Sequence, residues 1–285
     1  MGGSRFIMTR RAFLTMGATG LLGLARWAFE RKGAAMAKES EPYRGLKVGV
    51  HSYSLRKFNF ADTVRITNGF GVHYIGLNPL HLPLESPPEK LTEAKAYIER
   101  SGLTLLGCGV IGFDTDEKKA RQVFEYAKAM GMRTIAANPT PESLDILDKL
   151  VSEFGIRIAI HNHGPESEYY KLPEDVLKAI RGHHELIGAC VDFGHFERAG
   201  VKAEDALRDL TNRLYDVHLK DVNRADAKGH TVVLGQGIVN LPAILDDLVK
   251  MRFDGHVALE YESDPENPVP AMDKCFAYVR KVLAA

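Results

Sequence analysis

Four short apolar stretches of this chain each end in a side chain that carries an imidazole or a carboxylate group. The intervals between these side chains are 31, 26 and 42 residues, and each is about one strand–helix–strand unit. Successive parallel strands present their carboxyl ends on one face of a barrel, so the spacing predicts that the four side chains converge. They are His161, Asp192, His218 and Glu260.

Imidazole and carboxylate ligands together suit one divalent ion such as Mn²⁺, Co²⁺, Zn²⁺, Fe²⁺ or Mg²⁺, whereas structural zinc sites usually use thiolates. A single histidine or aspartate at a strand end is more often a loop-capping group, but four at this spacing are hard to explain in that way. We therefore predict that the four residues bind one divalent metal. Neighbouring polar residues are expected to contact a substrate or to make structural hydrogen bonds: Asn162, His163, Glu166, His195, Lys220 and Glu262.

Strand and helix patterns alternate through the rest of the chain. In the stretch 116–130, apolar residues recur at helical spacing and Gly131 follows as a C-cap. The polar stretch 221–237 is predicted to be a loop over the strand ends. Eight strand–helix pairs, without a Gly-x-Gly-x-x-Gly motif after the first strand, favour an α/β fold with a single (β/α)8 TIM barrel over a doubly wound sheet. We expect strands over 48–54, 73–77, 103–110, 133–137, 158–161, 187–192, 214–219 and 257–261, and helices over 60–70, 89–101, 116–130, 141–154, 173–181, 203–210, 241–251 and 269–283.

The composition limits the classes of function that the chain can have. Its 285 residues, 45% of them hydrophobic, are enough for a large core, and α/β barrels typically have about 250 residues. Lysine plus arginine and aspartate plus glutamate number 37 each, so the formal net charge is zero and no nucleic-acid partner is indicated. Cys108, Cys190 and Cys275 are odd in number and widely spaced, which predicts no disulfide framework.

The N-terminus resembles a twin-arginine export signal. Paired arginines in 9–14 precede a weakly hydrophobic run over 15–25, and Ala35-Met36-Ala37 would serve as the cleavage site. A basic N-terminal helix of a cytosolic protein is the alternative interpretation. The apolar run is shorter than the roughly 20 residues of a transmembrane helix, so no stable membrane span is expected. We predict a periplasmic or other extracytoplasmic location, with a signal segment over 1–37, a linker over 38–45 and a barrel over 46–285.

The chain also resembles the xylose isomerase-like TIM barrel superfamily, a group of sugar isomerases and epimerases that includes ketose 3-epimerases and inosose dehydratases. The resemblance implies that Asp192, His218 and Glu260 occupy three of the family's four metal-binding positions, and that His195 is its substrate-contacting histidine. We expect His51, in the similar opening strand, to contact the substrate as well. The motifs that carry the resemblance are Asp192-Phe193-Gly194-His195, His218-Leu219-Lys220-Asp221, Leu259-Glu260-Tyr261-Glu262 and the strand 49–54.

His161 stands where the resemblance implies a glutamate. The family's epimerases use two metal-bound glutamates as acid and base on opposite sides of a sugar carbon, and only Glu260 of that pair is present here. Either His161 takes the missing role, since imidazole titrates near neutral pH, or the reaction handles its proton mainly from one side. The second alternative points to a lyase or hydratase acting on inosose-type keto-sugars or 3-keto-glycosides.

The chemistry shared by these enzymes predicts a metal-dependent isomerase or epimerase. A metal polarises a carbonyl and acidifies the neighbouring C–H, and a carboxylate or imidazole removes the proton. We assign catalytic roles to Glu260, His161, His195 and Lys220, with Lys220 as a cation that holds the resulting enediolate. The export signal, and a sequence without a Gly-rich phosphate loop, favour a non-phosphorylated sugar or keto-sugar as the substrate. The sequence leaves open whether the protein forms a homo-oligomer.

Two alternatives from other functional classes stay open. A sugar-binding barrel without catalytic activity would follow if His161 has broken the catalytic pair. A DNA-repair endonuclease of a related barrel type would need several metal ions and a basic face for the phosphate backbone, against which the zero net charge argues.

Overall fold

A computed structural model describes residues 41–285 of the chain. Within that range, Gly45–Ala285 form one compact unit. The predicted signal segment (1–37) and part of the predicted linker (38–45) lie outside the described residues, so both stay predictions. Among the helices of the described range, none combines the length and the apolar character needed to cross a membrane.

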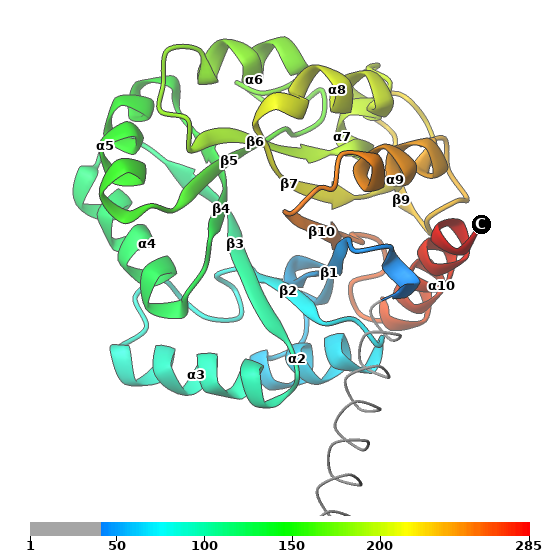
Figure 1. The fold of residues 1–285 in the computed structure, drawn as a ribbon, viewed down its shortest axis with the longest axis horizontal. Helices are drawn as coiled ribbons and strands as arrows, with labels where there is room; N and C mark the ends of the chain where they lie inside the picture. Colours follow the sequence, from blue (N-terminus) through cyan, green and yellow to red (C-terminus); the bar gives the residue numbers. More distant parts are fainter. Residues whose placement is uncertain (1–40) are drawn as a thin grey trace, which may run out of the picture. The chain divides into compact units, whose positions relative to one another are not determined.

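Eight parallel strands close into a barrel, and helices surround it (Figure 1). Around the barrel the strands follow the order β1-β10-β7-β6-β5-β4-β3-β2, so strands consecutive in sequence are neighbours apart from the short β8 and β9. The prediction of a single (β/α)8 barrel is therefore confirmed. The barrel strands are β1 (Lys47–His51), β2 (Tyr74–Leu77), β3 (Thr104–Phe113), β4 (Thr134–Pro139), β5 (Arg157–His161), β6 (Ile187–Asp192), β7 (Leu214–Leu219) and β10 (His256–Leu259).

Local sequence signals explain where the helices begin and end. In α4, the Asp116 side chain accepts a hydrogen bond from the backbone N–H of Lys119, and Gly131 ends the helix with a left-handed φ of 74°. Gly155 ends α5 in the same way, with a φ of 66°. The α-helices are α2 (Phe60–Gly69), α3 (Pro88–Arg100), α4 (Glu117–Met130), α5 (Leu144–Phe154), α6 (Pro173–Ile180), α7 (Phe193–Arg198), α8 (Ala203–Leu210), α9 (Leu241–Lys250) and α10 (Val269–Ala284), with 3-10 helices at Glu41–Tyr43, Ser52–Leu55, Pro141–Ser143 and Thr211–Arg213.

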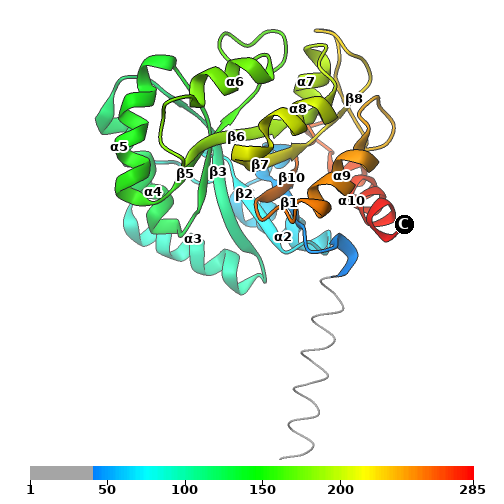
Figure 2. The same cartoon turned by 45° about the horizontal axis from the view of Figure 1, so that its top comes forward.

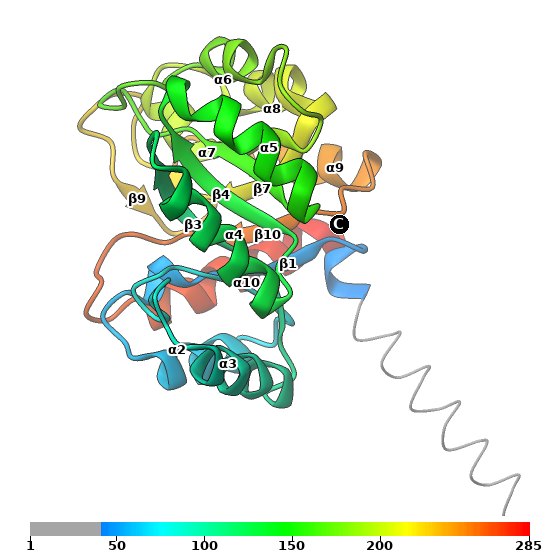
Figure 3. The ribbon, with the colours of Figure 1, turned by 90° about the vertical axis from the view of Figure 1, so that its left-hand side faces the viewer.

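Two elements that follow barrel strands differ from the sequence-based expectation. The turn expected after Asp192 is the short helix α7, which lies next to α8 (Figure 2). The predicted loop 221–237 contains two short strands, β8 (Asp221–Val222) and β9 (Thr231–Val232), which pair in the antiparallel direction. In a side view of the barrel, β9 lies near the end opposite to the C-terminus of the chain (Figure 3).

The barrel interior near the amino ends of the strands is filled by a histidine. His256, at the start of β10, extends towards β1 and β2, where glycines leave room for its ring. A Cβ atom at Gly49 would lie 2.7 Å from His256 Nε2, and one at Gly76 would lie 3.3 Å from its Nδ1. Asp216 of β7 is the Cα partner of His256, and both are buried.

Candidate metal centre and active site

The four predicted metal ligands come from neighbouring strands of the barrel. His161 and Asp192 are the last residues of β5 and β6, His218 lies one residue before the end of β7, and Glu260 follows β10 directly. These strands are adjacent around the barrel, and Asp192 and His218 are Cα partners. All four residues are buried, with at most 3% of their surface exposed.

The potential ligand atoms of these residues face one another. His161 Nε2 lies 3.0 Å from His218 Nδ1, and His218 Nδ1 lies 3.1 Å from Glu260 Oε2. Asp192 Oδ2 lies 3.7 Å from His161 Nε2 and 3.9 Å from His218 Nδ1. Atoms that bind one ion at about 2.1 Å lie roughly 3 to 4 Å apart, so the four residues fit a single divalent metal.

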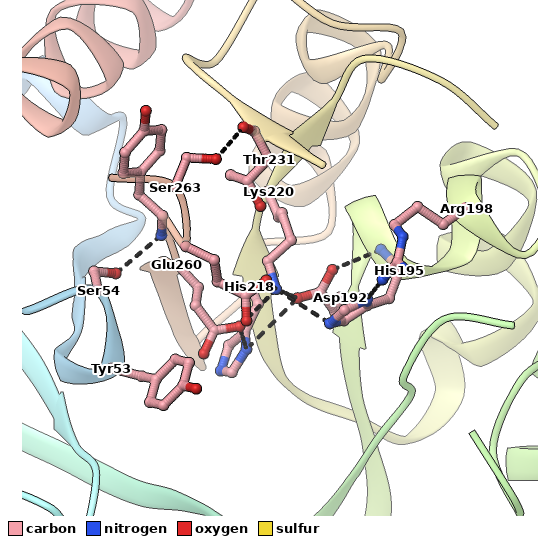
Figure 4. A network of polar contacts seen from close by, with 12 residues as sticks. Tyr53, Ser54, Asp192, His195, Arg198, His218, Lys220, Thr231, Glu260 and Ser263 are labelled. Atoms are coloured by element: carbon pink, nitrogen blue, oxygen red, sulfur yellow. Dashed lines mark hydrogen bonds and ion pairs between the residues drawn. The ribbon is translucent and has the colours of Figure 1, made fainter. Parts of the chain in front are cut away.

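Lys220 supplies a buried positive charge next to the two carboxylates. Its Nζ lies 2.9 Å from Asp192 Oδ2 and 2.9 Å from Glu260 Oε2 (Figure 4). Burial alone would disfavour the charged form of all three groups, but the attraction between them outweighs it. The pKa of Asp192 and that of Glu260 are therefore lowered, and the pKa of Lys220 is raised. All three groups are charged at neutral pH.

His51 links Glu260 to the backbone of β3. Its Nε2 lies 2.9 Å from the carbonyl oxygen of Gly109, and its Nδ1 lies 2.8 Å from Glu260 Oε1. Burial lowers the pKa of His51, and the neighbouring Glu260 carboxylate acts in the opposite direction. Because Glu260 is ionised, its oxygen is the acceptor of the contact with His51 Nδ1.

Helix α7 brings His195 and Arg198 into the site. Asp192 Oδ1 accepts a hydrogen bond from the backbone N–H of His195 (2.8 Å), so Asp192 caps α7 while its Oδ2 faces the other ligands. His195 Nε2 lies 3.2 Å from Lys220 Nζ, and its Nδ1 lies 3.2 Å from Arg198 Nη1. Burial and these two cations lower the pKa of His195, so its imidazole stays neutral. Arg198 also forms an ion pair with Glu166 (2.9 Å).

A cavity of about 410 Å³ borders this cluster and contains most of the predicted substrate-contacting residues. Its lining includes the predicted residues His51, His161, His163, Glu166, His195, Glu260 and Glu262.

Four predicted residues lie apart from the cavity wall. The Asn162 amide is fully buried and pairs with the backbone of Asp192, donating to its carbonyl (3.0 Å) and accepting from its N–H (2.8 Å). Asp192, His218 and Lys220 are also outside the lining, so Lys220 reaches the cavity only through Glu260, Glu262 and His195.

Sequence reasoning missed four residues of the cavity wall. Arg198 lies three positions after His195 on α7, and Asn78 is the first residue after β2, so helix spacing and strand ends were the available signals. The strand end before Asn78 was predicted at the correct residue, but its side chain was not singled out, and helix α7 was not predicted, so its spacing could not be used. The four missed residues are Tyr53, Asn78, Val110 and Arg198.

Asp221, the residue after Lys220, anchors the segment that follows β7. Its Oδ2 accepts hydrogen bonds from the backbone N–H groups of Gly235 and Gly237 (both 2.9 Å). Its Oδ1 accepts from Val222 (2.9 Å) and Val239 (3.1 Å). Only glycine fits at 237, because a Cβ there would collide with the Asp221 carboxylate. The segment 222–239 is thus folded around one buried carboxylate.

Comparisons with known proteins agree with this architecture. The chain is 28% identical over 162 residues to an inosose dehydratase of Mesomycoplasma hyopneumoniae, which covers 50% of this chain and 53% of that protein. The chain thus spans about half the length of that relative. An inosose dehydratase of Clostridium perfringens is 26% identical over 225 residues, covering 70% of this chain and 73% of its own.

Solved structures share the fold at lower identity. L-ribulose 3-epimerase has a TM-score of 0.68 at 17% identity, covering 84% of this chain and 95% of that chain. The IolI protein with a bound zinc atom has a TM-score of 0.65 at 19% identity, covering 84% of this chain and 98% of that chain. The family model described as the xylose isomerase-like TIM barrel matches residues 64–281. With that match over most of its barrel, the chain belongs to the xylose isomerase-like TIM barrel family.

Proposed function

We propose that the protein is a divalent-metal-dependent isomerase or epimerase that removes a proton next to the carbonyl of a non-phosphorylated sugar or keto-sugar. The observation that carries this proposal is the position of Glu260. One of its oxygens belongs to the cluster of four potential metal ligands, and its side chain also lines the adjoining cavity. A base at that position can reach a substrate whose carbonyl lies beside the metal.

The ligand set is His161, Asp192, His218 and Glu260, and a metal bound there would polarise the substrate carbonyl and acidify the neighbouring C–H. That acidification matters because the neighbouring Lys220 lowers the pKa of Glu260, which makes its carboxylate a weak base. The zinc atom in the IolI structure supports a divalent metal in this fold.

Two histidines are placed to assist Glu260. Glu260 accepts the proton from carbon, and His51, whose Nδ1 lies 2.8 Å from Glu260 Oε1, holds the carboxylate in position. His195 is neutral and faces the cavity, so it serves as a hydrogen-bond partner for a substrate hydroxyl or enediolate oxygen. Lys220 contacts Glu260 and Asp192 instead of the cavity, so its role is to keep Glu260 ionised, and the expected contact with an enediolate has no support in this geometry.

A lyase or dehydratase acting on inosose-type keto-sugars or 3-keto-glycosides is the second candidate. The specific observation that favours it is His161, which provides a buried imidazole where a second catalytic carboxylate would stand in an epimerase. Elimination needs one base next to the carbonyl and an acid at the leaving group, so it does not need a second carboxylate on the opposite side of the sugar carbon. The inosose dehydratase relatives support this alternative at the level of similarity.

Solvent-deuterium exchange tests both candidates, since each begins with proton abstraction. Ketoses, inososes and 3-keto-glycosides are incubated with the metal-loaded protein in D₂O, and product analysis then separates epimerisation from elimination. Glu260→Gln should lower the exchange rate by about 10²- to 10⁴-fold, the usual contribution of a general base. Glu262→Gln, a matched change on the same cavity wall, should have a much smaller effect. If Glu260→Gln retains the metal and exchanges at the wild-type rate, Glu260 is not the base.

We further propose that the protein is exported in a folded state, as the motif Thr9-Arg10-Arg11-Ala12-Phe13-Leu14 indicates. Replacing Arg10 and Arg11 by lysine should retain the protein in the cytoplasm, as cell fractionation would show. Unchanged export of that variant would exclude the twin-arginine route.

A further inference from the structure

Lys220 contacts the same carboxylate oxygens that the candidate metal site uses. Its Nζ lies 2.9 Å from Asp192 Oδ2, the oxygen that faces His161 and His218, and 2.9 Å from Glu260 Oε2, the oxygen that faces His218. Figure 4 shows the lysine reaching between Asp192 and His218 towards Glu260. The ammonium group therefore shares its two main partners with the metal.

The fold keeps this lysine in place. Only 1% of the Lys220 side chain is exposed, and its stem packs against α7, where a Cβ at Gly194 would lie 2.7 Å from Lys220 Cγ. Glu262 Oε2 (3.1 Å) and His195 Nε2 (3.2 Å) complete its contacts. The ammonium is thus a fixed part of the site instead of a surface charge that can turn away.

The shared oxygens place the two positive charges close together. An ion bound about 2.1 Å from Asp192 Oδ2 cannot be more than about 5 Å from Lys220 Nζ, because that oxygen is 2.9 Å from the nitrogen. At such a distance in a buried site, the repulsion between a divalent ion and an ammonium group is strong.

We propose that Lys220 is a built-in competitor of the divalent metal, which holds Asp192 and Glu260 in ligand geometry before the metal binds and limits the affinity of the site afterwards. The proposal rests on the metal site described under the proposed function. It has two consequences of opposite sign. Without metal, removing the ammonium leaves two buried carboxylates uncompensated and destabilises the fold. With metal, removing the ammonium removes a repulsion and tightens binding.

The test is calorimetric titration of Co²⁺ into wild-type protein and Lys220 variants. Lys220→Met removes both the charge and the hydrogen bonds, and Lys220→Gln removes the charge but keeps N–H donors. Both should bind Co²⁺ with a Kd at least about tenfold lower than the wild type, a change of about 1.4 kcal/mol. Lys220→Arg keeps the charge and should resemble the wild type. Lys250→Met, the same change at an exposed lysine paired with Asp246, should leave the Kd unchanged.

Thermal unfolding supplies a second measurement. Without metal, Lys220→Met should melt at a lower temperature than the wild type, and Co²⁺ should raise its melting temperature by more than it raises that of the wild type. If Lys220→Met cannot be obtained without metal, it is produced with Co²⁺ and the rate of ion loss to a chelator is compared with that of the wild type. Slower loss from the variant is the expected result.

Two results would overturn the proposal and can be told apart. If the wild type binds Co²⁺ but both neutral Lys220 variants bind it equally or more weakly, Lys220 does not compete and the metal site stands. If neither the wild type nor the Lys220 variants bind Co²⁺ better than Asp192→Ala does, the metal site itself fails and the proposal fails with it.

Discussion

Single side chains at the strand ends serve two purposes at once. Asp192 caps α7 through Oδ1 and faces the other potential ligands through Oδ2. Glu260 contacts His218 and Lys220 through Oε2 and His51 through Oε1. Because each oxygen has its own partners, the carboxylate orientations are fixed by the fold. This fixed geometry is what a metal site requires of its ligands.

A substitution at His161 distinguishes the loss of a metal ligand from a general disturbance of the cavity. His161→Ala should raise the Kd for a divalent ion by at least about 100-fold, since losing a ligand should exceed the 10- to 100-fold effect of losing an outer hydrogen-bond partner. His163→Ala is the matched control, because His163 lines the same cavity but lies outside the ligand cluster. Calorimetry should show a normal Kd for that control. Equal losses in both variants would mean that His161 is not a ligand.

The sequence predicted that these side chains converge, but it did not predict which atoms contact one another. Four chemically suitable residues at strand ends were recognisable because strand ends can be located from apolar runs. Asp192 accepts a hydrogen bond from the first turn of α7, and Lys220 and Arg198 contact the two ring nitrogens of His195. These contacts depend on side-chain rotamers and on helix α7, and no local sequence pattern predicted that helix. The contact of Lys220 with Glu260 joins residues 40 positions apart, so only the closed barrel reveals it.

At the scale of elements, the segment after β7 depends on Asp221. Its buried carboxylate accepts backbone hydrogen bonds from both ends of the segment 222–239. Arg198 ties the middle of the segment to α7 by donating to the carbonyl of Ala227 (3.2 Å). The segment therefore helps to hold one side of the cavity wall, although its sequence looks like a polar loop.

Asp221→Ala should lower the free energy of unfolding by about 3 kcal/mol, because several backbone N–H groups lose a buried charged acceptor. Limited proteolysis should also cut within 222–239 faster than in the wild type. Asp226→Ala, an exposed change in the same segment, should change neither stability nor proteolysis appreciably. If Asp221→Ala and Asp226→Ala behaved alike in denaturant unfolding and proteolysis, the segment would not depend on the carboxylate.

The elements that could be predicted are those with strong local signals. Helix α4 was located by its apolar spacing and its terminal glycine, and the structure adds the cap at Asp116. The β8–β9 pairing was not predicted, since each strand has only two residues and is held by distant contacts such as that of Ser263 with the carbonyl of Thr231.

At the scale of the whole molecule, several imidazoles are buried in the barrel and its loops. Burial lowers the pKa of His51, His81, His161, His195 and His256, so each takes up its proton at a lower pH in the folded protein than in the unfolded chain. In the unfolded chain they titrate near 6.5. Their contribution to stability is therefore present above about pH 6.5 and is lost as the pH falls below that value. Burial raises the pKa of Asp216 to about 7. As the pH falls, the folded state therefore binds a proton at Asp216 before the unfolded chain does, and this increases stability at lower pH.

A substitution at His256 tests how much one buried histidine contributes to this pH dependence, because His256 lies in the barrel interior away from the cavity wall. Wild-type stability should fall between pH 6.5 and pH 5, and His256→Gln should reduce the slope by up to about 1.4 kcal/mol per pH unit, the value for one proton. Denaturant unfolding at several pH values measures both slopes. An unchanged slope in the variant would show that His256 takes up its proton in the folded state as easily as in the unfolded chain.

The barrel architecture could be predicted from the sequence, because it follows from the alternation of strand and helix patterns and from the length of the chain. Eight strand–helix units have few alternative closed arrangements, and parallel crossovers are almost always right-handed. The filling of the barrel interior by His256 was not accessible, since it depends on Gly49 and Gly76 lying opposite the same ring.

Metal analysis of the purified protein tests the central claim most directly. The wild type, reconstituted with a divalent ion and freed of excess, should hold about one ion per chain. Asp192→Ala and His218→Ala should each hold almost none while remaining folded by circular dichroism. Equal metal content in all three proteins would contradict a site formed by His161, Asp192, His218 and Glu260.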